Sequence, residues 1–153
     1  MNNDVYSKVV GVTFENRQNI LKELRQQNVW RSVSLIHTTF HNEQTGLDEP
    51  AIKVKDYTTK KEIGWIARTD IEKYINITQM TAELGNWEGT EYCNLYIPQK
   101  PTQKQYWNVK RYCESKGRKM PLYDARAYEQ VFAESRTEKV KSLDEQDGIS
   151  FMQ

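Results

Sequence analysis

Hydrophobic and polar residues alternate along much of the first hundred residues, and this predicts a β-rich region. Alternation puts apolar side chains on one face of a strand, and β-branched and aromatic residues favour the extended backbone. Five runs fit this pattern, at residues 6–14, 29–40, 51–57, 62–67 and 92–97. Residues 58–61 are expected to form the turn between the third and fourth runs, whereas residues 76–91 fit either a hairpin or an irregular loop.

Two helices are expected among these strands. Residues 16–27 have apolar side chains at helical spacing, with Asn16 placed to cap the first turn. A short helix is predicted over residues 70–75, and its apolar residues, Ile75 among them, would pack inward. The polar residues 41–50 are expected to form a loop that ends at Pro50.

A proline-bounded segment, residues 98–101, separates this region from a helical one. Thr102 and Gln105 have the spacing of a capping box, and Gly117 provides a C-terminal stop for the helix between them. A second helix is predicted over residues 124–136, and the apolar face of this helix would close on the first one as a helical hairpin. That face contains Ala125, Tyr128, Val131 and Phe132.

Together these elements predict an α+β fold in three parts. Residues 1–97 would form a small β-rich domain with one or two short helices, and residues 98–136 the helical hairpin. Residues 137–153 are charged and poor in apolar side chains, so we expect a flexible tail there. A chain of 153 residues is long enough for one domain of about 90 residues plus such an appendage.

Charge is balanced overall, at a net +1, but it is unevenly distributed. Residues 101–120 carry six basic side chains against one acidic side chain. This segment fits either a surface that meets phosphates or a solvated helix face. No apolar run approaches the length of a membrane span and the first residues are polar, so we expect a cytoplasmic protein with no membrane contact.

The sequence contains no pattern typical of an enzyme or a metal site. The motifs HExxH, GxSxG, P-loop and paired carboxylates are missing, and we expect a non-enzymatic protein without cofactors. Cys93 and Cys113 lack metal-ligand spacing and are interpreted as reduced thiols. His37 and His41 are four residues apart, but they fall in an expected strand and loop, where that spacing does not bring two ligands together.

Three segments of the N-terminal region together resemble the HIRAN domain family. Residues 9–18 resemble the family's opening strand and turn, and the run Asp-Glu-Pro-Ala-Ile-Lys-Val at 48–54 resembles its Asp-x-Asn-Ala-Ile-x-Val motif. Residues 63–68, Ile-Gly-Trp-Ile-Ala-Arg, resemble its Gly-Tyr-Leu-Pro-Arg strand. The resemblance covers about residues 5–97 and implies that residues 1–97 fold as a small OB-like or SH3-like β-barrel. The C-terminal helices resemble, more weakly, a helical appendage of phage and bacterial DNA-metabolism proteins.

The resemblance implies binding of single-stranded DNA, and in the eukaryotic members of the family capture of a free 3′ end. Thr13 and Phe14 fall where the family places a basic and an aromatic pocket residue, Asp48 falls on the pocket aspartate, and Trp65 can line the same groove. Leu47 stands where a stacking tyrosine is usual, and Thr13 removes a positive charge. These departures weaken the implied end capture and leave strand binding.

Single-strand binders combine aromatic faces with cations that follow the phosphate backbone. The rings that could serve are Phe14, Trp30, Phe40, Trp65 and Trp87, and the cations Arg17, Arg31, Lys53, Lys55, Lys60, Lys61 and Arg68. We select as the nucleic-acid site Thr13, Phe14, Arg17, Asp48, Lys53, Trp65 and Arg68, and as a secondary basic surface Lys104, Trp107, Lys110 and Arg111.

Two alternatives stay open at this level. The rings can instead belong to the core, and Asp48 can instead cap the loop before Pro50. The rival function is that of a protein-interaction adaptor, such as a phage-encoded inhibitor of a host enzyme, with a protein partner in place of single-stranded DNA. The sequence does not indicate an oligomeric state.

Overall fold

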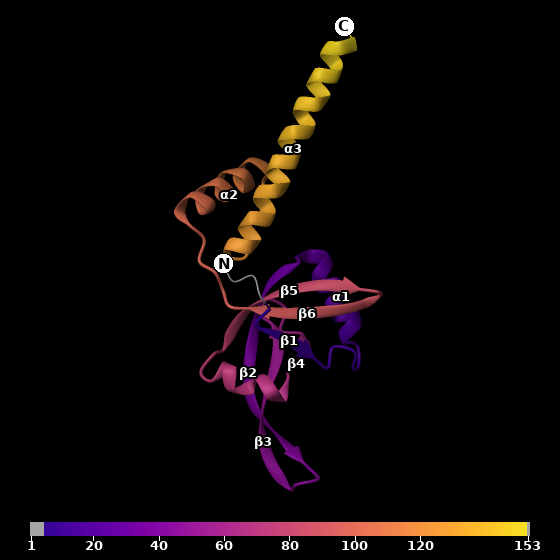
Figure 1. Cartoon of the computed structure of the whole chain (residues 1–153), viewed down its shortest axis with the longest axis vertical. Coiled ribbons are helices and arrows are strands. Elements are labelled where there is room, and N and C mark those ends of the chain that lie inside the picture. The colour runs from indigo at the N-terminus through magenta and orange to yellow at the C-terminus, as the bar shows by residue number, and fades with distance from the viewer. Residues whose placement is uncertain (1–4, 153) are drawn as a thin grey trace. The chain divides into compact units, whose positions relative to one another are not determined.

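The computed structural model describes the backbone of residues 5–152 and the side chains of residues 5–138. The chain divides into two compact units, Met1–Pro98 and Gln99–Gln153, and each is described by itself. The boundary between them along the chain falls within the proline-bounded segment, residues 98–101, that suggests a boundary in the sequence. Figure 1 labels the strands and the α-helices of both units.

The first unit is a closed barrel of six antiparallel strands in the order β1-β4-β3-β2-β5-β6, with two helices. This confirms the predicted small α+β barrel. The strands are β1 (Ser7–Val10), β2 (Trp30–Asn42), β3 (Leu47–Asp56), β4 (Glu62–Ile66), β5 (Gln79–Trp87) and β6 (Thr90–Tyr96). The helices are α1 (Arg17–Gln27) and the 3₁₀ helix η1 (Arg68–Tyr74).

Alternate residues of the strands fill the barrel, and α1 covers it. The wholly buried positions include Val33, Ile52, Val54, Ile63 and Leu95 from the strands, with Leu21 and Leu24 from α1. Each such aliphatic side chain contributes about 1.5–3 kcal/mol on leaving water. At Gly64 a Cβ would lie 2.4 Å from the carbonyl oxygen of Val10, so the pairing of β4 with β1 requires glycine there.

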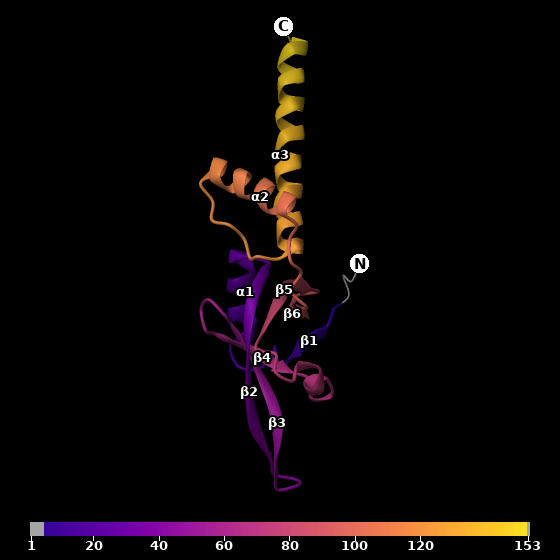
Figure 2. The same ribbon diagram turned by 90° about the vertical axis from the view of Figure 1, so that its left-hand side faces the viewer.

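Strands β2 and β3 continue past the barrel as a two-stranded arm. Their pairing runs from Val33↔Asp56 to Asn42↔Leu47, whereas β5 pairs with β2 only as far as Ser34 and β4 pairs with β3 only over residues 53–55. Figure 2 shows the two strands extending together away from the other strands. We use the name arm for residues 36–51.

The arm overturns the loop predicted at residues 41–50, where only residues 43–46 form the turn between strands. Both faces of the arm are largely exposed, so its sequence lacks the apolar alternation of a half-buried strand. Pro50 lies opposite Thr39 within the ladder. A proline fits there because its nitrogen faces the free edge of β3, where no ladder bond is lost.

Residues 76–91, predicted as a hairpin or an irregular loop, contribute most of the β5–β6 hairpin, which confirms the first alternative. Three smaller expectations are corrected. Strand β1 covers only four residues of the run 6–14. Asn16 does not cap α1 with its side chain, since its Oδ1 accepts a hydrogen bond from Asn19 at 2.6 Å. Ile75 lies beyond the end of η1 and is 68% exposed, not packed inward.

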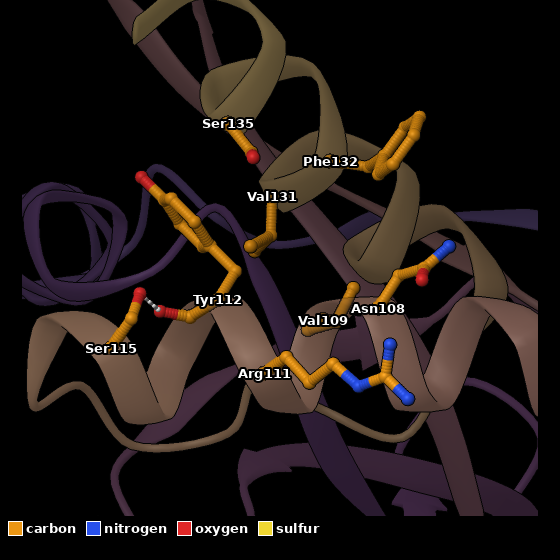
Figure 3. A pocket seen from close by; sticks show the side chains of 8 residues that line it. All are labelled: Asn108, Val109, Arg111, Tyr112, Ser115, Val131, Phe132 and Ser135. Carbon is orange, nitrogen blue, oxygen red and sulfur yellow. Dashed lines mark hydrogen bonds between the residues drawn. The ribbon is translucent and has the colours of Figure 1, made fainter. Parts of the chain in front are cut away.

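The second unit contains α2 (Gln103–Lys116) and α3 (Ala125–Met152). The capping box is present: Gln105 N–H donates to Thr102 Oγ1 (3.1 Å) and Thr102 N–H donates to Gln105 Oε1 (2.9 Å). Gly117 ends α2 in the left-handed conformation (φ 65°), as predicted. The two helices bury Val109 and Cys113 against Tyr128 and Val131; Figure 3 shows the two valines between the helices.

Two features of α3 differ from the prediction. The helix continues to Met152 instead of ending near residue 136, because residues 137–152 contain no proline and hold mainly residues that a helix accepts. The flexibility expected of that segment stays a prediction. Phe132 is half-exposed, with the Arg136 guanidinium 4.7 Å from its ring centroid, and is not part of the buried face.

Candidate nucleic-acid interface

Trp65 lies on the outer face of the barrel and is only partly buried. In the barrel register it stands opposite Val10 of β1 and Lys53 of β3. Directly opposed residues point to the same side of a sheet, so these three side chains share the outer face. The Lys53 ammonium lies 5.2 Å from the Trp65 ring centroid, in cation–π range. The outer face therefore presents a tryptophan beside a cation.

The turn after β1 brings a second ring to this tryptophan. Gly11 has a φ of +72°, which favours glycine, and a Cβ at Gly11 would lie 3.4 Å from Trp65 Cδ1 and 3.6 Å from Phe14 Cδ2. The two rings thus flank the same point on the backbone. Phe14 is 67% exposed and is not a core residue. Thr13, also exposed, lies in the same turn.

Trp65 also forms one wall of an open, mainly apolar groove of about 200 Å³ between the base of the arm and η1. The groove is lined by Phe40, Glu49, Pro50, Ala51, Trp65, Ile66, Arg68 and Ile71. Phe40 is half-exposed, and the exposed Arg68 guanidinium donates a hydrogen bond to Glu49 Oε1. The groove therefore brings together three of the candidate residues, Phe40, Trp65 and Arg68. Phe14 and Lys53 lie beside Trp65.

The prediction that Arg17 contacts a phosphate is wrong. The side chain is buried (6% exposed), and its Nη1 donates to the Gly11 carbonyl at 2.9 Å. Its Nη2 also lies 3.6 Å from Glu62. The guanidinium holds the turn that carries Phe14 and so supports the site from within. The sequence does not distinguish a buried arginine at the start of a helix from an exposed one.

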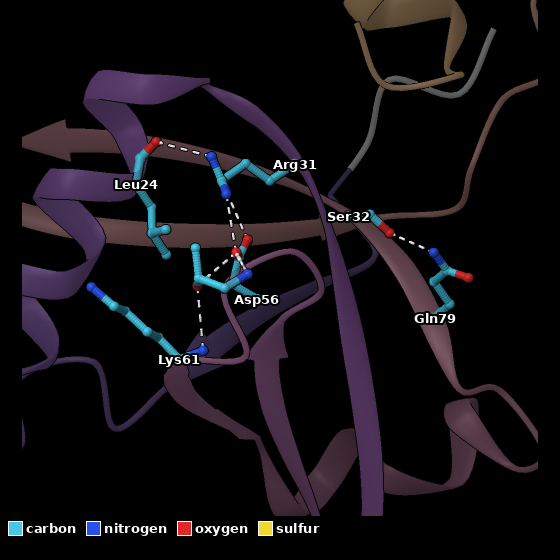
Figure 4. Close-up of polar contacts among 7 residues, drawn as sticks. Leu24, Arg31, Ser32, Asp56, Lys61 and Gln79 are labelled. Carbon is cyan, nitrogen blue, oxygen red and sulfur yellow. Dashed lines mark hydrogen bonds and ion pairs between the residues drawn. The ribbon is translucent and has the colours of Figure 1, made fainter.

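Arg31 is the second buried arginine among the candidate cations. It forms a two-point ion pair with Asp56, with N···O distances of 2.7 and 3.0 Å, and its Nη1 donates to the Leu24 carbonyl at 3.4 Å (Figure 4). Burial raises the pKa of Asp56, but the hydrogen bonds from Arg31 and Thr59 outweigh it and hold the pKa below its usual value. This pair has a structural role.

Asp48 is not part of the groove. Its neighbour Glu49 lines the groove, and successive residues of a strand point to opposite faces, so Asp48 points the other way. There it lies 2.8 Å from His41 Nδ1, its partner across the arm. Asp48 therefore neither caps a loop before Pro50 nor faces Trp65. Glu49 is the acidic residue that sequence reasoning missed, and the alternation along β3 is the signal that would have found it.

The cations of this surface are already paired with carboxylates. Lys53 donates to Glu62 at 3.0 Å, and Arg68 pairs with Glu49. The hydrogen bond from Lys53 is the main reason that the pKa of Glu62 lies below its usual value. The Lys53–Glu62 pair is partly exposed, and pairs near the surface contribute about 0–1 kcal/mol, so an incoming phosphate can replace Glu62 at little cost. The Arg68 side chain is 72% exposed, so it can contact a phosphate while it keeps Glu49, which is only 19% exposed.

The predicted secondary surface lies on α2. Lys104, Trp107 and Arg111 follow one another at helical spacing on the face opposite the buried Val109 and Cys113. Trp107 is half-exposed, and the Lys110 ammonium lies 4.9 Å from its ring centroid. Arg111 also borders an open groove of about 410 Å³ between α2 and α3, whose lining side chains are drawn in Figure 3.

The remaining candidate rings lie elsewhere. Trp87 is 70% exposed at the end of the β5–β6 hairpin and borders a separate pocket with Lys8 and Tyr92. Trp30 is partly buried, with its ring centroid 5.3 Å from that of Tyr96. In the part of the chain that the structure describes, three or more potential metal ligands do not come together anywhere. The described helices include none long and apolar enough to cross a membrane.

Comparisons of the chain with protein-family models, with curated proteins and with solved structures find no significant match in any of the three.

Proposed function

We propose that the first unit is a non-enzymatic module that binds single-stranded DNA, with a role in bacterial or phage DNA metabolism. One observation carries the proposal: Trp65 stands on the outer face of the barrel beside Lys53 and lines one groove with Arg68 and Phe40, with the exposed ring of Phe14 nearby. Exposed rings beside cations are the combination that single-strand binders use.

The balance of forces in this surface favours stacking over charge. Residues 1–100 carry 12 basic and 13 acidic side chains, so the net charge of this region does not attract a polyanion. Each base that stacks on an aromatic side chain contributes about 1–3 kcal/mol. Two or three stacked bases would therefore supply most of the affinity, and Lys53 and Arg68 would position the phosphates.

The resemblance of residues 5–97 to HIRAN domains agrees with strand binding. It also implies capture of a 3′ end, for which the family's pocket aspartate is needed. Asp48, at that position, faces away from the groove and lies 2.8 Å from His41. We therefore propose binding along a strand without selection of its end.

A fluorescence-anisotropy titration tests this function, using a labelled oligothymidylate with a free 3′ end and the same oligonucleotide with a blocked one. Both should bind equally. With two phosphate-contacting cations, the slope of log K against log salt should be about −1.4, which is a loss of about sevenfold between 50 and 200 mM salt. No binding at about 50 mM salt and micromolar protein would refute the function, and a strong preference for the free end would refute the proposed mode.

A second function is favoured by the groove between α2 and α3. Its walls combine Val109, Val131 and Phe132 with Arg111, a mixture typical of surfaces that hold a peptide. In this function the chain is an adaptor or inhibitor that binds a protein. Capture of a stoichiometric protein from a nuclease-treated bacterial lysate, lost in Phe132→Ser but retained in Trp65→Ala, would favour this function over the first.

A further inference from the structure

The outer edge of β2 has no partner strand along the arm. Pairing with β5 reaches Ser34, and a last backbone bond joins Leu35 N–H to the Thr78 carbonyl at 2.9 Å. Beyond it, residues 36–41 are all exposed. Within the described residues of the first unit, therefore, one side of β2 has open backbone groups over residues 37–41. At the base of this stretch the His37 side chain turns toward the chain before β5, with its Nε2 2.7 Å from the Ile77 carbonyl oxygen.

The hydrogen bonds at the base of the arm show which groups face outward. The Leu35 N–H points toward the β5 side, whereas the Ser32 carbonyl accepts from Tyr57 on the β3 side. Alternate residues of an antiparallel strand direct their N–H and C=O groups to opposite sides. The backbone groups of His37, Thr39 and His41 therefore face the open edge.

The two edges of the arm differ in protection. On β3 the outward residues are Asp48 and Pro50, a charge and a residue without N–H, and both discourage another strand from pairing. On β2 the stretch from Ile36 to Asn42 contains no proline, lysine, arginine, aspartate or glutamate. It is rich in residues that favour strands. One edge is thus blocked and the other is open.

We propose that the open edge of β2 pairs with the same edge of a second copy of this chain. An antiparallel arrangement centred on Thr39 places His37 opposite His41 of the second copy. In this register the backbone N–H and C=O groups of all three outward residues form hydrogen bonds with the facing strand. The same register sets Thr38 opposite Phe40 of the second copy, an aromatic–β-branched pair of the favourable kind. The segment carries no fixed charge, so two copies do not repel each other.

Sedimentation velocity over about 10 μM to 1 mM protein tests this pairing, since a short two-strand interface gives weak association. Wild type and Thr39→Ala, which keeps the outward N–H, should shift from monomer to dimer with concentration. Thr39→Pro, which removes that N–H and leaves the bonds to β3 in place, should stay monomeric. Thr39→Lys should also stay monomeric, because the lysines of the two copies would lie opposite each other and repel. Unlike proline, lysine keeps the backbone N–H.

A cysteine substitution tests the register. Opposed residues in a hydrogen-bonded pair have Cα atoms about 5.5 Å apart, within the range that a disulfide bridges. Thr39→Cys should therefore form a covalent dimer in mild oxidant, whereas Thr58→Cys, on the β3–β4 turn, should not. A wild type that stays monomeric at about 1 mM overturns the proposal in favour of a strand from another protein. A Thr39→Pro or Thr39→Lys variant that still dimerises overturns it in favour of another surface.

Discussion

Replacement of Trp65 by alanine is the most direct probe of the outer face of the barrel. The substitution removes the ring that lies between Lys53 and the groove, and with it the cation–π contact at 5.2 Å. One lost stacking interaction of about 1–3 kcal/mol corresponds to about a 5- to 150-fold rise in Kd for a single-stranded oligonucleotide. Trp65→Phe keeps a ring and should recover most of the affinity.

The assay is fluorescence anisotropy at fixed low salt, with a thermal melt followed by far-UV circular dichroism to show that each variant is folded. Trp65 is only partly buried, so we expect the barrel to survive its loss. Trp87→Ala is the matched control, because it removes an exposed tryptophan that borders a different pocket. Unchanged binding in Trp65→Ala together with weakened binding in Trp87→Ala would refute the site and move it to the β5–β6 hairpin.

Four further outcomes concern stability and are measured by urea denaturation. Gly64→Ala should cost about 3 kcal/mol or more, because its Cβ would meet the Val10 carbonyl oxygen at 2.4 Å. Asp56→Asn should cost about 3 kcal/mol, because it leaves the buried Arg31 charge without its partner. The pKa of Asp56 is lower in the folded state than in the unfolded state, so the charged side chain stabilises the fold fully above the unfolded-state pKa. This stabilisation is lost as pH falls through the folded-state pKa. The difference in free energy of unfolding between wild type and Asp56→Asn should therefore narrow below about pH 4. Thr102→Ala should cost the second unit about 1 kcal/mol by removing the cap of α2, with Thr102→Ser as the neutral control.

Local signals in the sequence were sufficient where the structure is local. Thr102 and Gln105 predict the start of α2 and Gly117 its end, because capping depends on residues a few positions apart. The β3–β4 hairpin follows in the same way from two apolar runs and a polar turn. The barrel itself was predictable as a class, but the closing pair, β1 with β6, joins residues far apart in the sequence.

The predictions that are wrong depend on which residues are exposed, and secondary-structure propensity does not indicate exposure. The outer part of the arm, residues 41–50, reads as a loop in the sequence because Pro50 and polar neighbours interrupt the pattern, although a strand exposed on both faces has no need of apolar alternation. Arg17 and Arg31 were expected at a surface, and burial of a charge is not visible before its partners are placed. Asp48 is predicted to lie in the groove, but Glu49 lies there instead. Because side chains alternate along a strand, an error of one residue puts the carboxylate on the opposite face of the arm.

The buried guanidinium of Arg31 joins segments that would otherwise open separately. The last turn of α1 contributes the Leu24 carbonyl and the end of β3 contributes Asp56, which also binds the amide of Thr59 in the following turn at 2.8 Å. Amide hydrogen exchange at Thr59 should therefore require unfolding of the whole barrel, whereas the amide of Thr38, which faces β3 within the arm, should exchange through local fluctuation alone. The barrel is in this sense a slowly opening base that carries a rapidly exchanging arm.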